Sequence, residues 1–233
     1  MNENGKDMGL PTTIAIDGPA ASGKSTLGAL LAKDLGYLYF DTGVMYRAVT
    51  LAVIKAGLDF SDEEAIGALA QQVHIDVKAP SVEDGRDYDV LLDGEVVTWE
   101  IRNETITDHV SDVSTYAAVR KAMTDQQRRI AMENNVVMVG RDIGTVVMPD
   151  ADLKIYLDAS VEIRAERRYR EIIERGENAE FDAVLRSLKN RDQIDSNREI
   201  APLKPAEDAI VIHADDLNVQ EVLEKAKELI SCV

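Results

Sequence analysis

Short apolar runs alternate along the chain with longer stretches in which apolar residues recur every three or four positions. The short runs predict buried strands at 13–17, 37–40, 136–139, 153–157 and 209–212. The longer stretches predict helices at 24–35, 45–56, 114–132 and 219–230, with a further helix after residue 160. Strands that alternate with helices form parallel sheets with right-handed crossover connections. The predicted fold class is therefore α/β, with a doubly wound parallel sheet.

Residues 61–118 break this alternation, because short β-like pieces replace the longer elements. Ser61 with Glu64 three positions later is typical of a capping box, here at the start of a helix that runs to about residue 73. Short strands are predicted at 74–78, 88–92 and 95–99. Asp93-Gly94 between the last two favours a two-residue hairpin. We therefore expect a small inserted antiparallel sheet, at a place where a second substrate can be held.

A loop of small residues follows the first predicted strand and precedes the first helix. It matches the phosphate-binding pattern G-x-x-x-x-G-K-[ST] in the strand, loop and helix order which that pattern requires. Backbone N–H groups of such a loop surround a polyphosphate, and the following helix adds the positive end of its dipole. Lys24 is expected to reach the β- and γ-phosphates of a nucleotide, and Ser25 to bind Mg²⁺. The expected nucleotide-binding residues are Gly18, Pro19, Ala20, Ala21, Ser22, Gly23, Lys24, Ser25 and Thr26.

Composition and charge exclude several classes of protein. Of the 233 residues, 45% are hydrophobic, which is enough to bury a sizeable core. A net charge of −17 argues against a nucleic-acid or anionic-membrane partner, because both require a basic surface. No uncharged apolar run has membrane-spanning length, and residues 1–11 lack the apolar segment of a secretory signal. Cys232 is the single cysteine, which indicates a reducing compartment, so we expect a cytoplasmic monomer with small-molecule substrates.

Arginine is concentrated between residues 164 and 198, against the acidic balance of the whole chain. Solvated helices with i,i+4 ion pairs are one interpretation of this segment. The other is a mobile lid that excludes water from a phosphate site when it closes. Spacing alone does not rank these arginines as phosphate ligands.

A phosphate loop is compatible with three classes of protein, namely a phosphoryl-transfer kinase, a GTPase switch and a mechanical or assembly ATPase. The GTPase motifs N-K-x-D and D-x-x-G do not occur in the sequence. The strand at 136–139 does not end in a plain Walker-B acid, since Gly140 and Arg141 come before Asp142. Phosphoryl transfer requires aligned phosphates, neutralised charge and exclusion of water. Arginine suits that task because its planar fork donates to phosphate oxygens in pairs, so the kinase class is favoured.

Four segments carry a resemblance to a known family. They are the loop at 18–26, Asp-Thr-Gly-Val-Met-Tyr-Arg at 41–47, Gly-Arg-Asp-Ile-Gly-Thr-Val-Val at 140–147, and the segment from Arg191 to the Arg-Glu-Ile-Ala-Pro-Leu run at 198–203. Through them the chain resembles the bacterial cytidylate kinases, P-loop enzymes of the nucleoside monophosphate kinase family, from the phosphate loop to the last helix. The resemblance implies transfer of the γ-phosphoryl group of MgATP to CMP or dCMP.

The resemblance also implies domain boundaries. We expect a mobile tail at 1–11 and a single P-loop kinase domain at 12–233. Within that domain, the monophosphate-binding insertion is expected at about 61–118 and an Arg-rich lid at about 162–180.

Each residue that matches the family is implied to have a role. The donor phosphates of ATP and the metal are held by Lys24, Ser25 and Thr26. The acceptor phosphate is held by Thr42, Arg47, Arg141 and Arg198, with Thr42 standing where related enzymes often have serine. The cytosine-recognising positions are Ser111, Arg120 and Asp142, and the sugar positions are Arg191 and Asp195. The implied catalytic residues are Lys24, Arg141, Arg191 and Arg198.

The chemistry of the base agrees with the position of Asp142. The exocyclic amino group of cytosine donates to a carboxylate, whereas uracil would present an acceptor to it. UMP is therefore expected to be the poorer substrate. Asp142 could instead act on Mg²⁺ through water, because it follows a buried strand. Asp17 and Asp41 also end strands beside the expected site, and Asp41 is expected to orient an arginine or a metal-bound water.

Two other functions stay open at the level of sequence. One is a P-loop kinase for a different small acceptor, such as UMP or a non-nucleotide metabolite. The other is a nucleotide-binding regulatory or assembly domain without turnover. The presence of Arg47, Arg141, Arg191 and Arg198 argues against the second, because a binding domain has no need of so many phosphate ligands.

Overall fold

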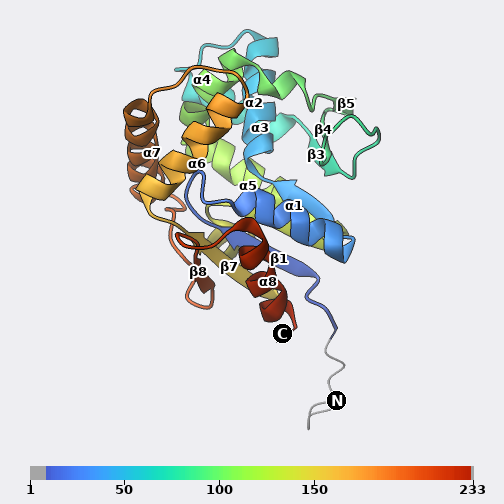
Figure 1. The fold of residues 1–233 in the computed structure, drawn as a ribbon. Coiled ribbons are helices and arrows are strands. Elements are labelled where there is room, and N and C mark those ends of the chain that lie inside the picture. The colour runs from blue at the N-terminus through green and yellow to red at the C-terminus, as the bar shows by residue number, and fades with distance from the viewer. Residues whose placement is uncertain (1–8, 232–233) are drawn as a thin grey trace.

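A five-stranded parallel sheet lies at the centre of the computed structural model, which describes residues 9–231 (Figure 1). The strands are β1 (Thr13–Asp17), β2 (Leu38–Asp41), β6 (Val136–Gly140), β7 (Leu153–Asp158) and β8 (Ile210–His213). Their order across the sheet is β2-β6-β1-β7-β8, and every neighbouring pair is parallel. Ile14, Ala15 and Ile16 of β1 are fully buried. Burial on both faces explains why the sequence of β1 is a continuous apolar run rather than an alternating one.

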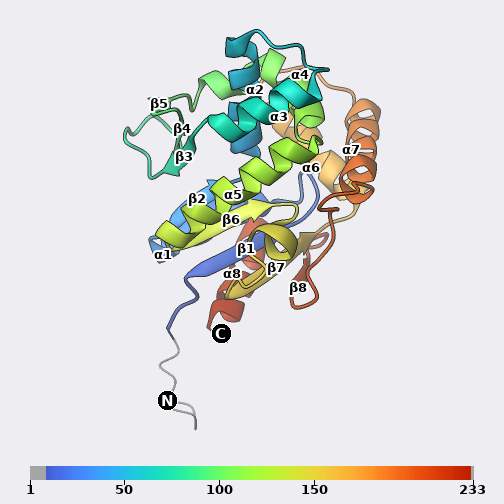
Figure 2. The ribbon, with the colours of Figure 1, turned by 180° about the vertical axis from the view of Figure 1, so that it is seen from behind.

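Helices cover both faces of this sheet. α1 (Lys24–Leu35) and α8 (Val219–Ile230) lie on one face and α5 (Ala117–Glu133) lies on the other, as Figures 1 and 2 show from opposite sides. Leu27 and Leu31 of α1 are among the buried residues of the core, as their helical spacing predicts. The predicted α/β class with a doubly wound parallel sheet is therefore confirmed.

The carboxyl ends of the strands meet at one edge of the sheet. In the sheet register Asp17 lies between Gly140 of β6 and Tyr156 of β7, while Asp41 of β2 lies beside Val139. β1 and β6 are neighbours whose following connections run to opposite sides of the sheet. Ligands bind at such a switch point in open α/β sheets, and the phosphate loop follows β1 directly at this point.

A small antiparallel sheet is inserted between β2 and β6, as the sequence predicts. The inserted elements are α2 (Gly43–Ala56), α3 (Glu63–Gln72), β3 (Ile75–Lys78), β4 (Asp89–Leu92), β5 (Glu95–Val96), a 3-10 turn (Glu100–Arg102) and α4 (Glu104–Val113). Asp93 and Gly94 have φ values of 51° and 89°, the positive values that a two-residue hairpin of this kind needs. β5 ends earlier than predicted, because the Thr98 hydroxyl oxygen, instead of a backbone carbonyl, accepts the Val90 N–H at 2.9 Å.

The helix predicted over 114–132 begins later, and a helix that was not predicted precedes it. α4 ends at Val113 and α5 begins at Ala117. Asn103 caps α4, where its side chain accepts the Ile106 N–H at 2.9 Å. Ile106 and Val113 are the buried residues of α4. Ile106, Val110 and Val113 recur every three or four positions, so the sequence contained a helical signal here that the prediction missed.

A turn and two helices, together with β7, lie between β6 and β8 in the chain. A π-helical turn, Ile143–Val147, follows β6 and was not predicted. α6 (Val161–Glu174) and α7 (Phe181–Ser196) then lie against each other (Figure 1). They include the expected lid at about 162–180, whose closure stays a prediction.

Parts of two predictions lie outside the described residues, namely residues 1–8 of the expected tail and Cys232. Within residues 9–231, none of the helices combines the length and the apolar character that crossing a membrane would need.

The capping box predicted at Ser61 is wrong, because Asp62 caps α3. The Asp62 side chain accepts the Ala65 N–H at 2.9 Å, one position later than the predicted box. Ser61 is engaged elsewhere, since its hydroxyl donates to Asp59 at 2.7 Å and its N–H to the same oxygen at 2.8 Å.

Replacing the cap should therefore cost more than replacing its neighbour. Asp62→Ala is expected to lower the free energy of unfolding by about 1 kcal/mol, because one N–H of the first helical turn loses its acceptor. Ser61→Ala is expected to change it by less than about 0.5 kcal/mol, as most surface substitutions do. Urea unfolding of both variants measures the difference, and equal losses would contradict the cap assignment.

Candidate active site

The phosphate loop passes close to β7 and turns directly into α1. A Cβ atom on Gly18 would lie 2.2 Å from the carbonyl oxygen of Leu157, so only glycine fits at this position. Gly23, with φ of 96°, leads into α1 at Lys24. The first turn of α1 therefore adds its free N–H groups to those of the loop, which is the arrangement that binds phosphate.

One cavity of about 1890 Å³ joins the phosphate loop to the arginine-rich segment. The predicted site residues that line it are Ala20, Ala21, Ser22, Gly23, Lys24, Ser25, Thr26, Arg47, Ser111, Arg141, Arg191, Asp195 and Arg198. The predicted site residues that do not line it are Gly18, Pro19, Thr42, Arg120 and Asp142. A pocket for one small ligand typically has about 300–1,000 Å³, so this cavity has room for two such ligands.

Lys24 is buried in the wall of this cavity. Its Nζ donates to the carbonyl of Pro19 at 2.8 Å, and only 5% of the residue is exposed. Burial, and to a smaller extent the positive charge of Arg141, lower the pKa of the Lys24 amine to about 7. A bound anion would favour the protonated amine. Lys24 is therefore placed where a phosphate would offset the cost of burying its charge.

Ser25 and Asp41 offer oxygen ligands beside the loop. The Ser25 hydroxyl donates to Asp41 Oδ2 at 2.9 Å, across the carboxyl ends of β1 and β2. Hydroxyl and carboxylate oxygens are the ligand types that Mg²⁺ prefers, usually together with substrate phosphates. Among residues 9–231, no group of three or more His, Cys, Asp or Glu side chains could hold a metal without such help. The residues present therefore fit a metal that is bound together with a nucleotide.

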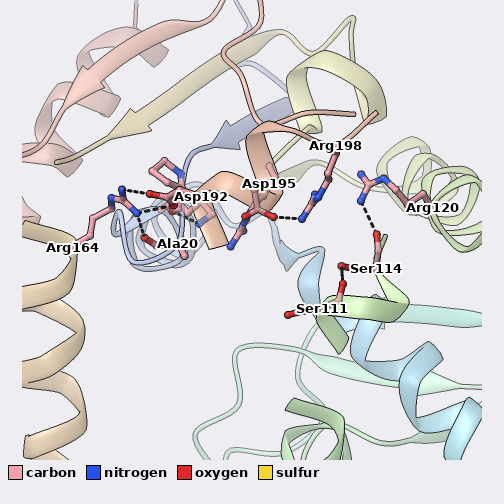
Figure 3. Close-up of polar contacts among 11 residues, drawn as sticks. Ala20, Ser111, Ser114, Arg120, Arg164, Asp192, Asp195 and Arg198 are labelled. Carbon is pink, nitrogen blue, oxygen red and sulfur yellow. Dashed lines mark hydrogen bonds and ion pairs between the residues drawn. The ribbon is translucent and has the colours of Figure 1, made fainter. Parts of the chain in front are cut away.

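Asp195 is the buried carboxylate around which the acceptor-site arginines gather. It is 1% exposed, and one of its oxygens accepts Arg141 Nε at 2.6 Å. Its other oxygen accepts Arg198 Nη2 (Figure 3). Arg191, one turn earlier on α7, also lines the cavity. Burial, and to a smaller extent the positive charge of Arg141, lower the pKa of the Arg191 guanidinium group. Burial also lowers the pKa of Arg198. Three guanidinium groups in one wall create a positive potential suited to a phosphate.

Arg120 and Asp142 form a buried ion pair behind the cavity wall. Arg120 Nη2 donates to Asp142 Oδ2 at 2.7 Å, and its Nη1 donates to the carbonyl of Ser114 at 3.2 Å (Figure 3). The Ser114 hydroxyl in turn donates to the carbonyl of Ser111, so these contacts connect the residues expected to recognise the base. Arg120 Nε is buried without a partner among the described residues. An unpaired buried donor is a group that a ligand can satisfy.

Two residues expected at the acceptor phosphate differ in their accessibility. Arg47 lines the cavity, and its Nη1 donates to the carbonyl of Ile101 at 3.2 Å and to the Thr107 hydroxyl at 3.1 Å. Thr42 is 5% exposed, and its hydroxyl donates to the carbonyl of Val139 at 3.1 Å. The phosphate contact expected of Thr42 stays a prediction.

Spacing alone did not reveal what the first arginines of α6 do, because their partners lie in the phosphate loop. Arg164 donates to the carbonyl of Ala20 at 3.1 Å and forms a two-point ion pair with Asp192 of α7 (Figure 3). Arg167 donates to the carbonyl of Ser22 at 3.2 Å. These two side chains attach the loop to the arginine-rich helices.

The fold and this cavity, in which a phosphate loop and an arginine-rich wall share one space, define a P-loop kinase. A family model described as Cytidylate kinase matches residues 14–232. The chain therefore belongs to the cytidylate kinase family, and it is an ATP-dependent nucleoside monophosphate kinase. Use of ATP by this family implies a divalent metal.

Similar proteins support this membership. A cytidylate kinase of Chloroflexus aggregans is 52% identical over 92% of this chain and 91% of its own length. One from Herpetosiphon aurantiacus is 48% identical over 96% of each chain. A solved structure of an uncharacterized protein from Eubacterium ventriosum matches 94% of this chain and 98% of its own, with a TM-score of 0.53 at 10% identity. That structure shares the fold only.

Removing Arg164 should loosen the phosphate loop. Arg164→Ala is expected to lower the free energy of unfolding by about 2 kcal/mol, less than a fully buried pair because Asp192 is partly exposed. It should also raise the Kd for ATP, since Ala20 loses its contact with α6.

Arg170 provides the matched control on the same helix. Its ion pair with Glu166 is exposed and it does not line the cavity. Arg170→Ala should change stability by less than about 0.5 kcal/mol and leave ATP affinity unchanged. Calorimetric ATP binding and urea unfolding measure both effects. Wild-type ATP affinity in Arg164→Ala would contradict a role in holding the loop.

Proposed function

We propose that the protein transfers the γ-phosphoryl group of MgATP to CMP or dCMP, giving ADP and CDP or dCDP by direct in-line transfer. The observation that carries the proposal is the single cavity, which is lined both by Lys24 of the donor loop and by Arg141, Arg191 and Arg198. Cytidylate kinases with about half of their residues identical to this chain support the choice of acceptor.

The donor side is built from the phosphate loop. Backbone N–H groups of the loop and the Lys24 amine bind the β- and γ-phosphates of ATP in this proposal. A bound Mg²⁺ would supply positive charge that offsets the negative charge developing on those phosphates. Ser25 is the residue proposed to hold the metal, and Asp41 fixes the direction of the Ser25 hydroxyl through their 2.9 Å hydrogen bond.

The acceptor side is built from arginines that Asp195 holds in place. Arg141 uses Nε for Asp195, and its two terminal nitrogens make no hydrogen bond within residues 9–231, so both can donate to a phosphate. Arg191 likewise has no side-chain ion pair within the described residues. Alignment of two phosphates by fixed donors supplies most of what this reaction needs, without a covalent enzyme intermediate.

Recognition of the base is proposed to depend on Ser111, Arg120 and Asp142. The Asp142 carboxylate accepts the exocyclic amino group of cytosine, and Arg120, which has an unpaired Nε, donates to the acceptor atoms of the base. Both side chains are almost fully buried. Water therefore does not satisfy their remaining hydrogen-bonding groups, and an uncharged base that did so would gain free energy of binding.

Both sides of the cavity are formed by this chain, so the proposed reaction requires no residue from a second copy, and we propose a monomer. The net charge of −17 provides no basic surface for nucleic acid, so small nucleotides are the proposed partners. A cytoplasmic location is proposed on the single cysteine, which is typical of a reducing compartment.

Turnover with different acceptors tests the proposed reaction. ADP release from MgATP should be rapid with CMP and dCMP, and about 100-fold or more slower in kcat/KM with UMP, because a mismatched buried polar group is costly. AMP, GMP and shikimate should support little turnover. ATP binding without turnover on any of these acceptors would contradict the acceptor assignment and leave the donor loop in place.

Replacing Asp142 separates base recognition from metal binding. Asp142→Ala is expected to raise KM for CMP about 100-fold with little change in KM for ATP, because a charge-assisted hydrogen bond to the base is lost. Steady-state kinetics at several Mg²⁺ concentrations distinguish the two roles considered for Asp142. A change confined to the Mg²⁺ dependence would favour action on the metal through water.

Lys24→Ala should abolish most turnover while the fold remains, since it removes a donor-phosphate ligand. The same kinetics, with urea unfolding as a check of the fold, measure this effect. Near-normal kcat in Lys24→Ala would contradict the donor-site assignment.

A further inference from the structure

The carboxylate of Asp17 connects the end of β1 to the turn that follows β6. Its Oδ1 accepts the Ile143 N–H and its Oδ2 accepts the Gly144 N–H, both at 2.8 Å. Only 4% of Asp17 is exposed. The two donors belong to the π-helical turn Ile143–Val147, so one side chain holds two consecutive amides of a turn that lies 126 residues further along the chain.

Asp17 therefore holds the segment of Arg141 and Asp142 at both ends. Before the segment, Gly140 is the direct partner of Asp17 in the register of β1 and β6. After it, Ile143 and Gly144 donate to the Asp17 side chain. Arg141 and Asp142 lie between these two fixed points, so their backbone has little freedom to move. Side chains that bind a phosphoryl acceptor need such support if they are to stay in one geometry.

We propose that Asp17 is a positioning residue for the phosphoryl acceptor, because it fixes Arg141 and Asp142 where the acceptor phosphate and base are bound. The inference rests on the proposed function, since it concerns the acceptor half of that site. Asp17 touches neither substrate in this proposal and acts through the turn. Its removal should weaken binding of the acceptor far more than binding of ATP.

The ionisation of Asp17 matters for this task. Burial raises the pKa of Asp17 to about 6, although the N–H groups of Gly144 and Ile143 oppose the shift. The groups that face it are Asp142, which raises the pKa, Lys24 of α1, which lowers it, and Lys154 and Tyr156 of the neighbouring β7. Above about pH 6 both oxygens are acceptors, whereas below it one becomes a hydroxyl and accepts less well. The hold on the turn should weaken as the pH falls through about 6.

Asp17→Asn tests the proposal, because an amide nitrogen then faces one of the two N–H groups. We expect KM and Kd for CMP to rise about 10- to 100-fold, the effect of losing one hydrogen bond to a charged group. KM for ATP should stay within about twofold. Steady-state kinetics and calorimetric binding of CMP measure these values.

Asp152→Asn is the matched control, because Asp152, just before β7, binds backbone N–H groups at the opposite end of β1. Asp152 accepts the N–H groups of Thr12 and Thr13 at 2.8 and 3.0 Å, far in register from Gly140. Its substitution should leave KM for CMP within about twofold of the wild-type value. Equal effects of the two variants on KM for CMP would overturn the proposal, and so would an Asp17→Asn enzyme that loses stability with unchanged KM for CMP.

The pH profile provides a readout that a purely structural role would not alter. The acceptor phosphate itself titrates near pH 6, so the informative quantity is the ratio of KM for CMP between Asp17→Asn and wild type. This ratio should be largest near pH 8 and fall below about pH 6, where wild type also loses the carboxylate. A ratio that does not depend on pH would overturn the proposal.

A measurement on the wild-type protein applies even if Asp17→Asn does not fold. The amide resonances of Ile143 and Gly144 should titrate together between pH 5 and 8 with a midpoint near 6. Amides that do not shift over this range would overturn the proposal. Because this titration needs no turnover, a positive result in an enzyme that fails to phosphorylate CMP would refute the proposed acceptor and leave the link between Asp17 and the turn intact.

Discussion

Parallel pairing of β1 with β6 and β7 is the constraint on which the site depends. Because parallel strands end at the same edge, the pairing brings the phosphate loop after β1, the Arg141-Asp142 segment after β6 and the end of β7 to one place. The carbonyl of Leu157 then approaches Gly18 so closely that no side chain fits there. The donor loop and the acceptor segment are therefore parts of one packed edge rather than independent loops.

A strongly acidic chain concentrates positive charge in this one cavity. Burying a guanidinium group is costly unless a carboxylate is paired with it, and the site contains such partners. Asp195 forms ion pairs with Arg141 and Arg198, and Asp142 forms one with Arg120. Pairs of this kind add little net stability. In the proposed reaction they hold the arginines in position before a phosphate binds, which is the preorganisation that charge-stabilising catalysis requires.

The arginine-rich helices act on the donor side as well as on the acceptor side. Arg164 and Arg167 of α6 donate to carbonyl groups of the phosphate loop, while Asp195 of α7 holds the acceptor arginines. The ion pair between Arg164 and Asp192 joins the two helices. The phosphate loop and the arginines proposed for the acceptor phosphate are thus both attached to α6 and α7.

Local patterns by themselves determined the strands of the parallel sheet, the phosphate loop and the last helix, whose bounds at 219–230 agree with the structure. An apolar run, a glycine pattern and a 3.6-residue period are all contained within a few residues, so they can be read in sequence. The cap at Asp62 was missed because Ser61 and Asp62 are adjacent candidate caps. α4 was missed although Ile106, Val110 and Val113 recur at helical spacing.

Resemblance to a family supplied the candidate site residues, and the tertiary structure decided how they are held. The partners of Arg164 lie 28 and 144 positions away in sequence, and those of Asp17 lie 126 and 127 positions away. No local period connects residues so far apart. Which arginines hold the loop, which line the cavity, and which carboxylate fixes the turn were therefore decided only when the sheet brought its strand ends together.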